Sequence, residues 1–218
     1  MTKFCLLSIT TAAAALSAAA SADAAFVYSS ALRSISLTSP AGTSAVSSNA
    51  FGDFLEFRSF SAPMVSGALQ QASTLGVDSM SFGAFAQLFS NSAGFAGPLN
   101  GTSLSSVVFS VGADLQASLG VGTTTQSSGA SAAVGISVVL RDVATGSVIY
   151  STNTNATDSL DLSLVAGRSY QLDITSAASV ASGVGNAFTN YSVSITAVPA
   201  PGVLATLGLA AMARRRRR

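Results

Sequence analysis

Apolar and polar side chains alternate along several segments of the chain, which is the pattern of strands that bury one face. In NYSVSITAV (190–198), Tyr191, Val193 and Ile195 alternate with hydroxyl residues. SLDLSL (159–164) and SYQLDIT (169–175) show the same period. The connection VAGR between these two segments includes Gly167, so it predicts a short hairpin.

Further strands are expected upstream. Ile136, Val138 and Leu140 form one apolar face, and DVATGS (142–147) predicts a hairpin turn into VIYST with Gly146 in the left-handed region. The alternation from Val107 to Leu115 predicts one long strand. Weaker strand signals cover 26–38, 54–60 and 80–88.

Two segments are harder to assign from their pattern. The stretch 61–73 fits either a short helix capped by Ser61, with Pro63 in its first turn, or another strand, and both remain open. The run SLGVGTTTQSSGASAA (118–133) is rich in Gly, Ser and Thr, which favours a flexible loop or linker.

Many short strands separated by Gly, Ser and Asn turns predict an all-β domain over residues 25–197. We expect an antiparallel β-sandwich of jelly-roll or immunoglobulin-like kind. A solenoid is disfavoured because no fixed repeat period is found.

The first 24 residues have the layout of a secretory signal peptide. Lys3 places a positive charge near the N-terminus, and an uncharged stretch rich in Ala and Leu follows to Ala20. Ala22 and Ala24 are the small residues of the expected cleavage site. We expect cleavage after Ala24. A buried Ala-rich helix is the weaker alternative, because it does not require this order of parts.

The last 21 residues, Val198 to Arg218, combine a proline motif, an apolar run and a basic cluster. Pro199 and Pro201 keep the backbone extended and accessible. The run Val203 to Ala213 suits a helix in lipid, but its rise of about 17 Å falls short of the roughly 30 Å of hydrocarbon. Arg214 to Arg218 resist translocation, so this tail predicts a transient hook in the membrane.

This order of parts resembles a PEP-CTERM sorting domain, over about a tenth of the chain. The motif residues are Val198, Pro199, Ala200, Pro201 and Gly202; Ala200 replaces the usual acid, and the apolar run is short. The membrane stop consists of Arg214, Arg215, Arg216, Arg217 and Arg218. The resemblance implies export, processing by an exosortase-like membrane enzyme after signal peptidase, and delivery to the cell envelope or beyond.

Charge argues against the other interpretations of the basic tail. The chain has ten basic and nine acidic residues, but residues 25–197 contain only four arginines against eight acids. An acidic, exported body conflicts with a nucleic-acid partner, and a solvated tail or a patch for anionic lipid is the weaker alternative.

Few residues suited to catalysis or metal binding are present. The chain has no His, and its single Cys, Cys5, lies in the signal peptide, so the common triads and zinc sites are excluded. Carboxylate pairs remain, namely Asp53 with Glu56 and Asp158 with Asp161, for glycosidase chemistry. Asp158 beside Asn153 and Asn155 is a weak candidate for calcium. The tyrosines that would stack on sugars if exposed are Tyr28, Tyr150, Tyr170 and Tyr191.

We therefore expect a secreted structural protein, targeted to the surface or matrix, without catalytic activity, cofactor or bound metal. The alternative is a carbohydrate- or calcium-binding module of the envelope, with extracellular polysaccharide as partner. A glycoside-active enzyme is a third reading.

Overall fold

The computed structural model describes residues 25–198, which form ten antiparallel strands and no helix in that range. This confirms the expected all-β, antiparallel class. The strands are β1 Val27–Ser39, β2 Gly42–Ser48, β3 Phe54–Ala62, β4 Val65–Leu75, β5 Ser79–Ser110, β6 Leu115–Ser128, β7 Ala132–Asp142, β8 Val148–Thr152, β9 Ala156–Leu164 and β10 Ser169–Ala197.

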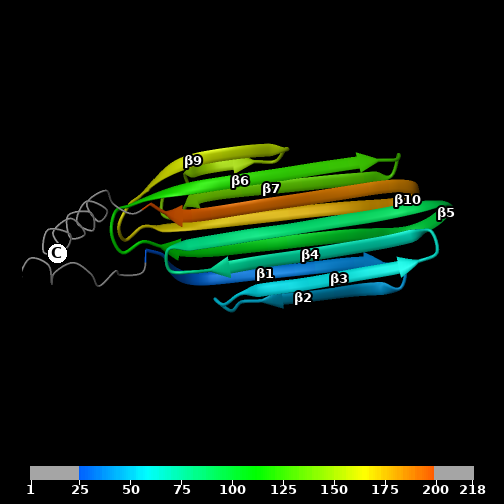
Figure 1. The fold of residues 1–218 in the computed structure, drawn as a ribbon, viewed down its shortest axis with the longest axis horizontal. Coiled ribbons are helices and arrows are strands. Elements are labelled where there is room, and N and C mark those ends of the chain that lie inside the picture. Colours follow the sequence, from blue (N-terminus) through cyan, green and yellow to red (C-terminus); the bar gives the residue numbers. More distant parts are fainter. Residues whose placement is uncertain (1–24, 199–218) are drawn as a thin grey trace, which may run out of the picture.

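Two unusually long strands, β5 and β10, pair along almost their whole length, from Ser79 opposite Thr196 to Ser110 opposite Ser169. Halfway along, the register shifts between Val180 and Val184, and Gly97 (φ 144°) and Gly183 (φ 67°) take backbone angles that other residues avoid. Extra residues of this kind bend a ribbon sharply. Both strands turn back here, at the right-hand end of the molecule in Figure 1.

The bend gives the sheet two arms. The first arm contains, in order, β3, β4, the first half of β5, the second half of β10, β6 and β9. The second arm contains β2, β1, the second half of β5, the first half of β10, β7 and β8. Among the described strands, the strand pairing continues from one arm to the other only through the two long strands.

Buried side chains from both arms meet in shared clusters, so the arms face each other. Phe82 and Ile195 of the first arm lie in one cluster with Phe109 and Leu172 of the second. A smaller cluster near the bend joins Leu69 and Leu88 to Ile35 and Val180. Burial of these apolar side chains from water is the main stabilising contribution to such a core.

Buried polar residues, which we call the polar belt, lie between the two clusters. Gln71 Nε2 donates to Ser105 Oγ at 2.5 Å and to the Leu104 carbonyl at 3.0 Å. Ser103 Oγ and the Tyr191 hydroxyl lie 3.0 Å apart. The members of the belt are Arg33, Gln71, Ser73, Ser103, Ser105, Ser176, Thr189 and Tyr191.

Two hairpins decide between helix and strand for residues 61–73 and confirm one predicted turn. Residues 61–73 are strand, because β3 and β4 pair through a turn at Pro63 and Met64, with Met64 at φ 64°. The predicted hairpin between β7 and β8 is confirmed, and Gly146 has a φ of 69°.

Three expectations about connections are wrong. The predicted loop over 118–133 is mostly strand β6, in which Ala117, Leu119 and Val121 are buried and small residues face outward. The long strand predicted from Val107 to Leu115 is interrupted, because β5 ends at Ser110 and β6 begins at Leu115. The segment VAGR does not close a hairpin, since β9 pairs with β6 while β10 pairs with β5, β6 and β7.

Candidate functional site

The two ends of the described chain meet at the turn between β4 and β5. The Phe26 amide donates to the Val77 carbonyl at 2.9 Å, and the Ala197 amide donates to the Asp78 carbonyl at 2.8 Å. The Val198 amide donates to the Gln116 carbonyl at 2.8 Å. Both ends therefore lie opposite the bend, at the left of Figure 1.

Of the residues predicted for the signal-peptide cleavage site and the sorting tail, the structure describes only Val198, which is 45% exposed and follows the end of β10. The predicted cleavage residues Ala22 and Ala24 lie outside the described residues. So do Pro199, Ala200, Pro201 and Gly202 of the sorting motif, the expected apolar helix, and the stop residues Arg214 to Arg218. The described chain therefore reaches the first residue of the motif directly from a hydrogen-bonded strand.

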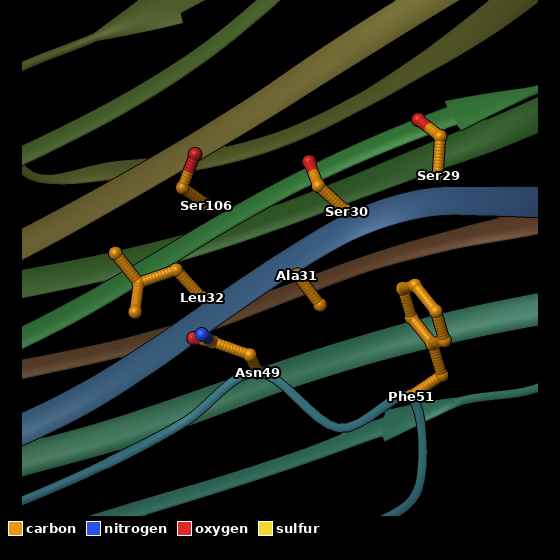
Figure 2. Close-up of a pocket in the computed structure, with 7 residues that line it drawn as sticks. All are labelled: Ser29, Ser30, Ala31, Leu32, Asn49, Phe51 and Ser106. Atoms are coloured by element: carbon orange, nitrogen blue, oxygen red, sulfur yellow. The ribbon is translucent and has the colours of Figure 1, made fainter.

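A hollow of about 450 Å³ lies on the outer face of the second arm. Figure 2 shows it between β1 and the loop after β2. Phe51 is 46% exposed and stacks on Tyr28, with ring centroids 6.3 Å apart. The lining residues are Ser29, Ser30, Ala31, Leu32, Asn49, Phe51 and Ser106.

The hydroxyl of Ser106 connects this hollow to a polar cluster around Asp173. Ser106 Oγ donates to Asp173 Oδ1 at 2.6 Å, and Gln171 Nε2 donates to the same oxygen at 2.9 Å. Arg141 donates to Asp173 Oδ2 at 3.0 Å. The carboxylate is thus neutralised and bonded on both oxygens, so the hollow offers stacking and hydroxyl groups to a ligand.

The carboxylates predicted to act in pairs are placed apart or engaged with the protein. Asp158 and Asp161 are three residues apart on β9, so they point to opposite faces of the strand. Asp158 Oδ2 accepts a hydrogen bond from the Tyr150 hydroxyl at 2.6 Å, and Glu56 forms an ion pair with Arg58 at 3.0 Å. Neither predicted pair forms a two-carboxylate site.

The calcium candidate is likewise engaged with the protein. Asn155 Oδ1 accepts hydrogen bonds from the amide and hydroxyl of Thr125, at 2.6 and 2.9 Å. Within residues 25–198 no group of three His, Cys, Asp or Glu side chains is placed to hold a metal ion. Asp158 and Asn155 therefore have protein partners at the weak candidate site for calcium.

The tyrosines do not provide an exposed stacking surface. Tyr170 and Tyr191 are buried in the core, and the Tyr28 hydroxyl donates to the Gly76 carbonyl at 2.7 Å. Desolvation raises the pKa of Tyr28 to about 12. For Tyr150 the pKa is also raised to about 12, by desolvation and then by its bond to Asp158.

The exposed aromatic side chains of the described residues are phenylalanines, and the sequence did not identify them as candidate site residues. In SFGAFAQLF (81–89), Ala84, Ala86 and Leu88 are buried, so Phe85, Gln87 and Phe89 point outward. The alternation in this segment contained the signal, but assigning faces required the positions of the neighbouring strands.

No family model matches the chain, and no curated protein matches it. No helix within residues 25–198 is long and apolar enough to cross a membrane.

Proposed function

We propose that this protein is an exported structural component, delivered to the cell surface or extracellular matrix by its C-terminal tail. The observation that supports this most strongly is the meeting of both chain ends at the Val77–Asp78 turn. A signal peptide and a sorting tail would then both leave from one end of the folded body. The rest of the body would extend away from the membrane that holds the tail.

In this proposal the tail acts in two steps. Signal peptidase removes residues 1–24, and the five terminal arginines keep the tail at the cytoplasmic side while the apolar run enters the bilayer. An exosortase-like enzyme then cuts near Val198–Gly202. Because β10 ends at Ala197, the cut leaves every strand intact.

We also propose that the body is a β-sandwich made of the two arms. The shared core clusters and the two bent strands support this assignment. A sandwich whose arms are joined by two continuous strands and a shared core suits a load-bearing role, because separating the arms would expose both core clusters to water. We assign it no catalytic step.

Deletion of Val198 to Arg218 tests the sorting role. We expect the truncated protein to leave the envelope fraction and accumulate in the periplasm or medium, because it lacks the stop for translocation. A matched control replaces Arg141 and Arg168 in the body by Gln and retains the tail, and it should fractionate like the wild type. Unchanged fractionation of the truncated chain would contradict the proposal.

A further inference from the structure

The outer face of the first arm presents exposed phenylalanines, which we call the phenylalanine face. Phe57 of β3 is 52% exposed, Phe89 of β5 is 41% exposed, and Phe85 and Phe188 are half-buried. Leu55, 68% exposed, extends the face on the edge strand β3. An exposed apolar surface of this kind, rimmed by polar groups, is typical of interaction sites.

The strand register arranges these rings in alternation with side-chain amides. Phe57 lies opposite Gln70, Gln70 opposite Phe85, and Phe85 opposite Asn190. In the next row the order is reversed, since Gln87 lies opposite Phe188 and Phe188 opposite Gln126. Aromatic rings and amides therefore alternate both along and across the strands.

The spacing of the rings follows from sheet geometry. Phe57 and Phe85 are two strands apart, which is about 10 Å. Phe188 lies diagonally from both Phe85 and Phe89, at steps of about 8 Å. Rings at these distances form a broad surface on one sheet face, wide enough for more than one sugar ring.

The face is also uncharged, although residues 25–197 have twice as many acids as bases. In the described residues, Asp161 is the only formally charged side chain on the outer side of the first arm. It pairs with Ser118, six residues along β6 from Thr124 in the Phe85 row, or about 20 Å. A neutral partner loses no ion pair and meets no repulsion here.

The outer face of the second arm is different in chemistry. It presents Ser34, Thr102 and Thr175 together with the Arg141–Asp173 ion pair at 3.0 Å, and the described strands place no phenylalanine on it. The two outer faces therefore differ: the first carries an array of phenylalanines without nearby charge, and the second is hydroxyl-rich and charged, with one aromatic stack of Phe51 on Tyr28 beside its hollow.

We propose that the phenylalanine face binds a neutral polysaccharide that has flat, C–H-lined sugar faces. The rings would cover the apolar faces of successive sugars, and the amides of Gln87 and Asn190 would bond their hydroxyl groups. This deepens the proposed function, because a matrix component needs a contact with the matrix polymer. The binding itself requires neither the tail nor its processing.

A binding isotherm on insoluble polymers tests the proposal with the full chain. Microcrystalline cellulose and chitin are the neutral probes, and immobilised polygalacturonate is the acidic one. We expect binding to at least one neutral polymer, and binding at least about tenfold weaker for the double variant Phe85→Ser, Phe89→Ser. A second variant, Gln87→Ala with Asn190→Ala, should weaken binding without removing apolar surface.

The matched control is Val143→Ser with Val165→Ser, which removes two exposed apolar side chains from connections outside the phenylalanine face and should bind like the wild type. Equal binding by the Phe variant, loss in the control, or preference for polygalacturonate would overturn the proposal. Absence of binding would also overturn the proposal. If the wild type is then a dimer that the Phe85→Ser, Phe89→Ser variant disrupts, a second copy of the chain covers the face instead. A chain ending at Ala197 should bind normally, which separates this test from the sorting test.

Discussion

Arg33 is a buried charged residue, and its burial is not evident from the sequence. Strand alternation places it on the inner face of β1, where it is fully buried between the two core clusters. Its guanidinium donates to the Gly52 carbonyl at 2.7 Å, to Ser73 Oγ at 3.0 Å and to the Ala50 carbonyl, and it stacks on Phe54. Desolvation lowers the pKa of Arg33, and the charge of Asp53 partly opposes this. Carbonyl dipoles and an aromatic face thus replace the water lost on burial.

Replacing Arg33 by Ala should therefore destabilise the protein strongly. The change leaves a cavity and removes the donor to the buried Ser73 hydroxyl and to two partly buried carbonyls, so we expect a loss of about 3 kcal/mol in the free energy of unfolding. Arg141→Ala is the matched control; its pair with Asp173 is partly exposed, so the expected loss is under about 1 kcal/mol. Urea unfolding of both variants measures the difference, and equal losses would refute the structural role of Arg33.

Asp142 predicts how stability responds to acid. The amides of Thr145 and Ala144 donate to its Oδ1, and Arg168 donates to its Oδ2 at 2.8 Å. The Thr145 bond is the main cause, followed by Arg168, of a pKa lowered from 3.8. A lowered folded-state pKa contributes stability that is present above 3.8 and is lost as the pH falls through the folded value.

Asp142→Asn should therefore flatten the fall in stability below pH 4, and Arg168→Ala should move that fall to higher pH. Unfolding free energies measured from pH 6 to pH 2 test this. A slope that is the same in wild type and Asp142→Asn would show that the turn does not contribute to acid sensitivity.

At the scale of elements, period-two alternation identified strands well and connections poorly. It located the faces of β7, β9 and β10, and the hairpin around Gly146, because each shows large apolar residues on one side. It missed β6, whose outward positions include Ser118, Gly120 and Gly122, residue types that also favour loops. The bend in β5 and β10 was not predicted, because its cause is a register shift between segments far apart in sequence.

The turn between β6 and β7 shows how tightly that bend is packed. Gly129 has a φ of 95°, and a Cβ atom there would lie 2.4 Å from the Val184 carbonyl oxygen and 2.8 Å from Gly185 Cα. Both contacts are with backbone, so relief requires moving β10 itself. The glycine is needed for its conformation and also for its lack of a side chain.

Gly129→Ala should cost about 2 kcal/mol or more, from positive-φ strain and the clash together. Gly135→Ala is the matched control, because nothing lies within 4 Å of its Cβ position, and it should stay within about 0.5 kcal/mol of wild type. Thermal unfolding compares the two; a neutral Gly129→Ala would mean that β10 is loosely held at its bend.

Across the molecule, the fold separates the two ends of the described chain from the proposed binding surface. Phe26 and Ala197 lie at the turn after β4, and the phenylalanine face follows the strands toward the bend. The signal peptide and the sorting tail were predicted from the sequence alone, because each prediction depends only on the order of residues within its own segment. The sequence did not predict the phenylalanine face, because its residues come from β3, β5 and β10. The tyrosines that would stack on sugars if exposed lie in or against the core.

We propose above all that the protein is an exported cargo with a removable segment at each end. The decisive measurement is the intact mass of the protein recovered from the cell envelope or matrix. We expect a chain that begins at Ala25 and lacks Arg214 to Arg218, with any attached group visible as added mass. A recovered chain that retains its five terminal arginines and shows no membrane association would contradict it.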